Sequence, residues 1–172
     1  MTLEGLRVLI AEDETIIRLD LKQMLEEHGL VVCGEARDGV EAVDLARVTK
    51  PDLAIFDLKM PNLDGVEAAR RVYAESPLPI IMLTAYSDQQ TVARAVGAGV
   101  FSYLSKPFGP NDVIPAVRAA VARHGDLLAA RREVGRREEP LEVELRSPSG
   151  HVWPLRVRRK HDGSIAVDVL PE

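Results

Sequence analysis

The sequence contains a single cysteine and no surplus of positive charge. One cysteine excludes an internal disulfide framework. Cys33 ends the apolar run Leu30–Cys33, which predicts a buried structural thiol. Lys and Arg number 22 against 27 Asp and Glu, so the net charge is −5 at pH 7. A chain with this charge has no bulk electrostatic attraction for nucleic acid.

Long hydrophobic runs are missing as well. No apolar stretch reaches the roughly 20 residues that a membrane-spanning helix needs. The N-terminus arrives at Glu12–Glu14 without the basic segment and apolar core of a secretory signal. We therefore expect a cytoplasmic protein that makes no contact with a membrane.

Short apolar runs alternate with amphipathic segments along the first two thirds of the chain. This alternation of strands and helices predicts an α/β fold with a doubly wound, five-stranded parallel sheet of the flavodoxin-like kind. Asp38–Glu41 and Asp64–Glu67 have the spacing of helix capping boxes. The predicted strands are Leu6–Ala11, Leu30–Glu35, Pro51–Asp57, Pro79–Thr84 and Val100–Ser105, and the predicted helices are Thr15–Glu27, Asp38–Val48, Asp64–Glu75, Asp88–Ala98 and a last helix from about Asn111.

Polar residues follow the predicted strands at their C-terminal ends. Right-handed crossovers bring these ends to one edge of a parallel sheet, where ligands bind. The residues concerned are Glu12, Asp13, Asp57, Thr84 and Lys106. Three carboxylates placed together repel one another, and a hard divalent cation such as Mg²⁺ offsets that repulsion. A lysine and a threonine beside the cation suit an incoming anion, so the set indicates phosphoryl transfer with a carboxylate as nucleophile.

Each of these residues also has an ordinary structural explanation. Glu12–Asp13 suits the N-terminus of a helix, Thr84 suits an N-cap, Tyr103 suits a half-buried strand, and Lys106 suits a solvated surface. These separate explanations do not account for why the polar groups all follow strands. Their shared position favours a site.

The motifs resemble the receiver domain of response regulators over roughly residues 5–122. Within that family, the stretches Ala11–Lys22 and Leu83–Ser87 are most similar to the antiterminator group that carries a C-terminal RNA-binding ANTAR module. The motifs that carry the resemblance are Glu12–Asp13, Asp57 with Met60–Pro61 and Asp64–Gly65, Thr84–Ala85, and Tyr103–Pro107.

The resemblance implies that Asp57 accepts a phosphoryl group from a histidine kinase or a phosphotransfer protein. It also implies a Mg²⁺ site made by Asp13, Asp57 and the backbone carbonyl of Lys59, with Glu12 acting through water. The chain would then be a signalling switch that assists its own phosphorylation and dephosphorylation. It would not be an enzyme with a separate substrate.

The family resemblance further assigns the residues that read out the phosphoryl group. Thr84 and Lys106 would bind its oxygens, and Tyr103 would change rotamer as Thr84 moves. A cis peptide bond between Lys106 and Pro107 would fix where the lysine points.

No ANTAR module is recognisable after the receiver motifs. We divide the chain into a receiver over 1–122, a helical extension over 123–140 and a small β appendage over 141–172. For the extension, a short dimerising coiled coil and a solvated helix both stay open, because the heptad positions after Leu128 fall on Arg131 and Gly135.

Strand-like alternation begins after Pro140, which ends the helical pattern. The segments Leu141–Arg146, Val152–Arg158 and Ile165–Leu170 predict an antiparallel meander with one apolar face, too small to be stable unless it packs on something. Its basic residues suit a solvated strand face better than nucleic acid, since Trp153 is the one aromatic side chain near them. They are Arg156, Arg158, Arg159 and Lys160.

These features predict a response regulator whose phosphorylation switches self-association or partner binding. A homodimer is one form that such an output could take. The alternatives are an RNA-binding antiterminator controlled by phosphorylation and a receiver-like scaffold that works without it.

Overall fold

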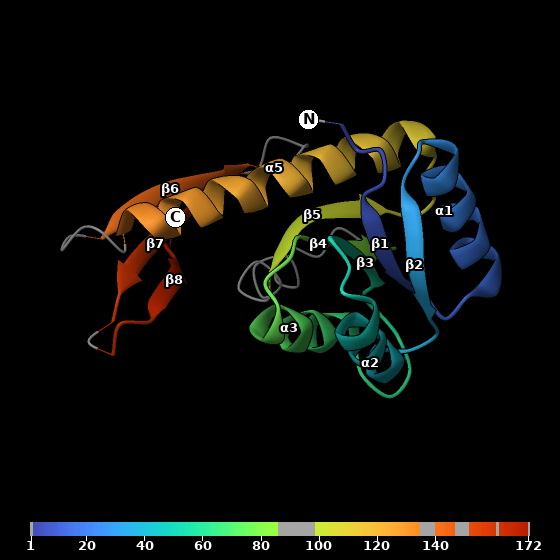
Figure 1. The fold of residues 1–172 in the computed structure, drawn as a ribbon, viewed down its shortest axis with the longest axis horizontal. Helices are drawn as coiled ribbons and strands as arrows, with labels where there is room; N and C mark the ends of the chain where they lie inside the picture. The colour runs from blue at the N-terminus through green and yellow to red at the C-terminus, as the bar shows by residue number, and fades with distance from the viewer. Residues whose placement is uncertain (1, 86–98, 135–139, 147–151, 161, 172) are drawn as a thin grey trace.

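A computed structural model describes residues 2–85, 99–134, 140–146, 152–160 and 162–171 of the chain (Figure 1). Its larger part is a five-stranded parallel sheet with the strand order β2-β1-β3-β4-β5. The strands are β1 Arg7–Ala11, β2 Val31–Ala36, β3 Leu53–Asp57, β4 Ile80–Thr84 and β5 Val100–Ser105. The predicted parallel sheet is confirmed, although the strands expected from Pro51 and Pro79 begin at Leu53 and Ile80.

Helices cover both faces of this sheet, with α1 and α5 on one side and α2 and α3 on the other (Figure 1). Their bounds are α1 Thr15–Glu27, α2 Gly39–Thr49, α3 Gly65–Glu75 and α5 Pro110–Val134. The helix expected over 88–98 lies outside the described residues. Side chains alternate along each strand, so Val8 and Ile10 pack in the core on the α1 and α5 side, and Leu9 in the core on the α2 and α3 side.

The capping residues act as their spacing predicts. The side chain of Asp38 accepts a hydrogen bond from the amide of Glu41 at 2.8 Å, and that of Asp64 accepts one from the amide of Glu67 at 2.9 Å. Each bond satisfies an amide at the start of a helix that has no partner within the helix. Both helices therefore begin directly after a strand-end loop, and α3 begins beside Asp57.

Helix α5 is continuous from Pro110 to Val134, and it lies alongside both the receiver sheet and the C-terminal strands. The side chain of Arg123 donates to the carbonyl of Phe101 on β5 at 2.8 Å, which ties the middle of the helix to the sheet. Beyond that point His124, Leu127, Ala130 and Val134 are buried. None of the described helices is both long and apolar enough to cross a membrane.

The C-terminal strands form the predicted antiparallel meander. β6 Leu141–Arg146, β7 Val152–Arg159 and β8 Ile165–Val169 make a three-stranded sheet in the order β6-β7-β8. We call these three strands the tail. Pro154 lies in the central strand, and its carbonyl accepts from Leu170 just beyond the end of β8 at 2.8 Å. The missing amide of Pro154 therefore faces the end of β8, where a ladder bond is least needed.

The apolar face of the tail packs against α5. Trp153, Leu155 and Val157 are buried in the same hydrophobic cluster as Leu127 and Val134. A three-stranded sheet of this size needs such a cover to be stable. The fifth helix does extend as far as Val134, as one of the two alternatives for this segment expected, but its apolar face is covered by the tail and is neither solvated nor free for a coiled-coil partner.

The thiol of Cys33 is less buried than predicted, because the residue is half-buried. It lies on β2, which is an edge strand of the sheet and is covered less completely than the central strands. The thiol lies 3.4 Å from the carbonyl oxygen of Val8.

Two glycine-to-alanine changes should shift stability in opposite directions. A Cβ at Gly125, inside α5, would have no neighbouring atom within 4 Å, whereas a Cβ at Gly65 would collide with the carbonyl oxygen of Asp57. Gly125→Ala should raise the free energy of unfolding by about 0.5–1 kcal/mol. Gly65→Ala should lower it by about 1–3 kcal/mol. Urea unfolding followed by circular dichroism measures both. A stabilising Gly65→Ala would contradict the close contact with Asp57, and a destabilising Gly125→Ala would contradict the open space at Gly125.

Candidate functional site

The C-terminal edge of the sheet gathers three carboxylates. One oxygen each from Glu12, Asp13 and Asp57 lie within 4.8 Å of one another. Glu12 and Asp57 are buried, whereas Asp13 is exposed. Glu12 and Asp13 follow β1 and Asp57 ends β3, its immediate neighbour in the sheet. The parallel register of these two strands therefore brings the three groups together.

Lys106 provides a positive charge for this cluster. Its ammonium lies 2.7 Å from Oε2 of Glu12 and 3.2 Å from Oδ1 of Asp57, and its side chain is 16% exposed. The lysine follows β5, two strands away from β3, and reaches back across the edge of β4. Its amide donates to the carbonyl of Thr84 at 2.8 Å, and its peptide bond to Pro107 is cis.

Burial and charge act in opposite directions on these groups. Burial raises the pKa of Glu12 and of Asp57 above their ordinary values, although Lys106 works against the rise in both. For Lys106, burial alone would lower the pKa, but the hydrogen bonds and negative charges of Glu12 and Asp57 outweigh it and raise the pKa. The ammonium therefore keeps its proton, and one cation faces three carboxylates.

This donor set fits a hard divalent cation. Three clustered carboxylates with one ammonium leave an excess of negative charge, and oxygen ligands are those that Mg²⁺ prefers. Glu12, Asp13 and Asp57 are the residues that could hold the ion. Lys59 lies in the loop two residues beyond Asp57, and the use of its carbonyl as a ligand stays a prediction.

Thr84 and Tyr103 lie on the neighbouring strands β4 and β5. Thr84 is buried at the end of β4, beside the carboxylate edge, and pairs in register with Ser105. Tyr103 is half-buried and pairs with Met82, and burial raises the pKa of its phenol. β4 lies between β3, which ends at Asp57, and β5, which is followed by Lys106. Thr84 and Tyr103 therefore lie on the two strands that separate Asp57 from Lys106 along the sheet.

Gly65 allows the loop after Asp57 to bring the start of α3 back against the end of β3. The amide of Gly65 donates to the carbonyl of Leu58 at 3.0 Å, so the first turn of α3 lies directly against the end of β3. A side chain at this position would collide with the backbone of Asp57. Asp64 thus caps α3, and Gly65 lets the helix approach the end of β3.

The sequence analysis did not identify Arg18, whose side chain holds the backbone of the loop that carries Glu12 and Asp13. This buried side chain donates to the carbonyl of Glu12 at 2.7 Å, and its Nε lies 3.8 Å from a carboxylate oxygen of Glu35. Lys22 binds the other oxygen of Glu35 at 2.8 Å. The sequence held a clue, because Arg18 shares the buried face of α1 with Leu21 and Leu25.

Residues 8–118 match the model of the response regulator receiver domain, so the chain belongs to that family. The family predicted from the strand-end motifs is confirmed.

Similar proteins include the transcriptional regulatory protein PdtaR of Mycobacterium tuberculosis, which is 50% identical over 137 residues, covering 80% of this chain and 67% of PdtaR. The receiver match ends at residue 118, so a similarity that covers 80% of the chain also includes part of the segment after it. Protein-glutamate methylesterase/protein-glutamine glutaminase 4 of Myxococcus xanthus is 42% identical over 134 residues, 76% of this chain but 37% of that protein.

Solved structures support the fold of the receiver. The signal receiver domain of a modulated diguanylate cyclase from Desulfovibrio desulfuricans has a TM-score of 0.66 and 34% identity, covering 72% of this chain and 99% of that one. The response regulator domain of CheB from Thermotoga maritima has a TM-score of 0.65 and 28% identity, with coverages of 69% and 98%. Both matches take in nearly all of the compared receiver and leave part of this chain unmatched.

Replacing Arg18 should weaken binding of Mg²⁺ without unfolding the chain. Arg18→Met keeps the apolar stem but removes the hydrogen bond to the carbonyl of Glu12, so the loop carrying Glu12 and Asp13 loses its support. We expect the dissociation constant for Mg²⁺, measured by calorimetry, to rise about tenfold. Lys22→Met is the matched control, since it removes the bond to Glu35 and leaves Glu12 untouched. Equal effects of the two changes would contradict this role of Arg18.

Proposed function

We propose that this chain is the phosphoryl-accepting switch of a cytoplasmic two-component pathway. A histidine kinase or a phosphotransfer protein is the donor, and Asp57 is the acceptor. The observation that carries the proposal is the cluster of Glu12, Asp13 and Asp57 in contact with Lys106 at the sheet edge of a receiver. The charge balance of this cluster suits a divalent cation and an incoming phosphoryl group.

The transfer requires an ionised Asp57. Its carboxylate oxygen attacks the phosphorus of the donor phosphohistidine, the phosphorus–nitrogen bond breaks, and an acyl phosphate forms on Asp57. Burial raises the pKa of Asp57, and the ammonium of Lys106, 3.2 Å from Oδ1, partly offsets that rise and so favours the charged form. Mg²⁺ held by Glu12, Asp13 and Asp57 would offset the negative charge of the phosphoryl oxygens.

Lys106 and Thr84 are the residues we assign to sensing the new group. Both lie at the same edge, and the amide of Lys106 is bound to the carbonyl of Thr84, so displacement of one is transmitted to the other. Tyr103 on β5 is the proposed relay to the surface. Helix α5 starts four residues beyond Lys106 and continues to the tail, which gives a direct route from the site to the C-terminal strands.

The output we propose is a change in self-association or partner binding. The proposed organisation is a receiver over 1–122, a helical extension over 123–140 and a β appendage over 141–172 that contains the tail. The role of the last two segments is to carry and present the changed surface. No separate substrate is needed, because the chain acts on its own acyl phosphate.

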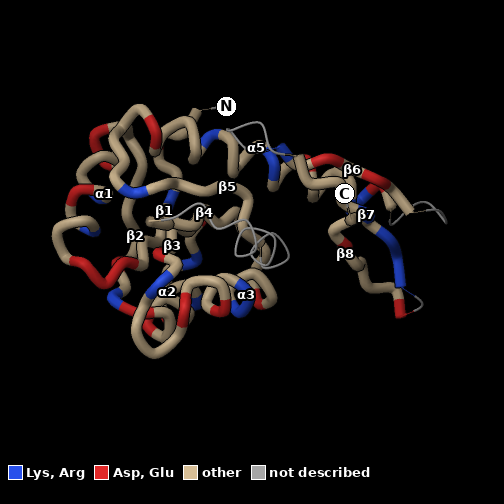
Figure 2. The backbone as a smooth tube through the Cα atoms, turned by 180° about the vertical axis from the view of Figure 1, so that it is seen from behind, with Lys and Arg blue, Asp and Glu red and all other residues tan. Residues whose placement is uncertain are grey.

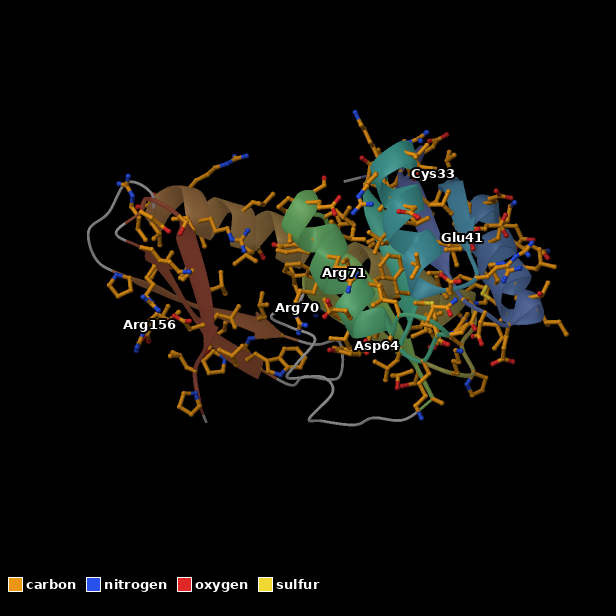
Figure 3. The ribbon with its side chains drawn as sticks, turned by 90° about the horizontal axis from the view of Figure 1, so that it is seen from below. Cys33, Glu41, Asp64, Arg70, Arg71 and Arg156 are labelled. Carbon is orange, nitrogen blue, oxygen red and sulfur yellow. The ribbon has the colours of Figure 1, made fainter. Side chains whose placement is uncertain are left out.

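An RNA-binding antiterminator is the second candidate, favoured by the resemblance to the ANTAR group and by the 50% identity with a transcriptional regulatory protein. Two observations weigh against it. The described residues after α5 form strands and no three-helix module. Arg156 is 2.8 Å from Glu142 and Arg158 is 2.8 Å from Asp168, so their charges are matched within the tail. Figure 2 shows the basic β7 beside the acidic β6, and Figure 3 shows Arg156 at the end of the molecule away from Glu41 and Cys33.

Phosphoryl incorporation tests the acceptor. With phosphoramidate and Mg²⁺, intact mass spectrometry should show one added phosphoryl group, and chelation of the metal should abolish it. Asp57→Asn should remove the modification because it removes the nucleophile. Asp44→Asn changes an exposed carboxylate on α2 and should leave incorporation unchanged. Incorporation into the Asp57→Asn variant at the wild-type rate would refute the assignment.

Lys106→Met should separate metal binding from the response. Loss of the ammonium removes a cation that competes for Glu12 and Asp57, so Mg²⁺ should bind at least as tightly as in the wild type. Beryllofluoride with Mg²⁺ should change amide hydrogen exchange in β5 and α5 of the wild type, and this change should be absent in the variant. A wild-type chain that does not respond would favour the scaffold alternative, which works without phosphorylation.

A further inference from the structure

The two edges of the tail sheet differ in chemistry. β6 and β8 are its outer strands, and neither is paired on its outer side within the part of the chain that the structure describes. β6 alternates charged and apolar residues, whereas β8 has the sequence Ile165–Ala166–Val167–Asp168–Val169. An edge strand of apolar residues with free amides and carbonyls is a template for pairing with another strand.

The register identifies which backbone groups of β8 are free. The amide of Lys160 donates to the carbonyl of Ser164, and the amide of Leu170 donates to the carbonyl of Pro154. In an antiparallel ladder the bonded residues alternate, so Ala166 and Asp168 also bond toward β7. The amides and carbonyls of Ile165, Val167 and Val169 therefore point away from the sheet.

On β6 the outward backbone groups belong to charged residues. Leu141, Val143 and Leu145 pair with the strand positions of β7 that bond toward β6, which leaves Glu142, Glu144 and Arg146 facing outward. Antiparallel pairing of two copies of β6 about this stretch would bring Glu142 and Glu144 of one copy near those of the other. Like charges placed in this way disfavour pairing, so β6 is a protected edge.

We propose that β8 is a self-association surface, at which a second copy of this chain pairs antiparallel about a two-fold axis at Val167. Val167 then faces its own copy, Ile165 faces Val169 of the other copy, and each of these pairs exchanges two backbone hydrogen bonds. Ala166 faces Asp168 of the other copy, and Asp168 is already bound to Arg158 at 2.8 Å. This register contains no pair of like charges.

The side chains support the same occupant. Ile165 and Val167 are only partly buried and Val169 is 40% exposed, because α5 packs on β6 and β7 and β8 lies on the side of the tail away from it (Figure 1). Pairing two copies at β8 would join the two tails into one sheet of six strands, with the apolar faces of both copies on the same side.

The interface is small, so we expect a reversible dimer of modest affinity. It does not depend on phosphorylation of Asp57, and the tests below contain neither phosphodonor nor Mg²⁺.

Cysteine cross-linking tests the register in the full chain. In a Cys33→Ala background, A166C and D168C protein are mixed and oxidised. The register places residue 166 opposite residue 168 of the other copy, within reach of a disulfide, and places two copies of residue 166 too far apart. A mixed disulfide dimer should form in clear excess over either homodimer. Homodimers in equal yield, or no cross-link at all, would overturn the proposal.

Proline at matched edge positions tests the surface itself. Val167→Pro removes an amide that points away from the sheet, so it should raise the dimer dissociation constant measured by sedimentation at least about tenfold. Glu144→Pro removes the equivalent outward amide of β6 and should leave the constant unchanged. A wild-type chain that is monomeric throughout the concentration series, or equal effects of the two prolines, would refute the proposal. A changed circular dichroism spectrum would mean that Val167→Pro disturbs the fold of the tail, and in that case the cross-linking experiment is the test of the proposal.

Discussion

The ion pair that Lys106 makes with Glu12 and Asp57 is the interaction on which the rest of the site depends. Three carboxylates gathered at one sheet edge, two of them buried, would repel one another strongly without a cation. A single ammonium neutralises part of that charge and leaves the remainder for a divalent cation. The same lysine is bound through its backbone to Thr84. Any group that displaces the ammonium from the carboxylates therefore also acts on β4 and β5.

Helix α5 connects this edge with the C-terminal strands. It begins beside the loop of Lys106 and remains helical to Val134, where its apolar face is covered by Trp153, Leu155 and Val157. The tail is too small to be stable alone, and the second half of α5 would otherwise expose apolar residues. Each supplies the burial that the other lacks. A displacement of α5 at its first turn would therefore move the tail as well.

Most of the receiver could be predicted from its sequence because its signals are local or follow from topology. Apolar runs mark the strands, Asp38 and Asp64 mark helix starts, and the crossover rule brings the strand ends to one edge. Sequence reasoning could not foresee that Arg18 would be buried under Glu12, because that depends on how α1 packs against the loop. The half-buried state of Cys33 depends likewise on β2 being an edge strand.

The covering of the helical extension by the tail could not be predicted, for a different reason. The sequence pattern was followed along Leu128 and Arg131, whereas the buried residues of this segment are His124, Leu127, Ala130 and Val134. The covering partner is a β-sheet, whose flat face accepts a helix without a strict heptad. The meander itself was predicted from alternation, but its docking on α5 links residues far apart in sequence and leaves no local pattern.

The identity of the modified residue tests the central claim most directly. Protein phosphorylated by a histidine kinase or by phosphoramidate can be reduced with borohydride, which converts an acyl phosphate on aspartate to homoserine. Peptide mapping by mass spectrometry then locates the converted residue. Our account predicts a single conversion, at Asp57, that requires Mg²⁺. Conversion at Asp13 or spread over several carboxylates, or a label that resists reduction because it is no acyl phosphate, would contradict it.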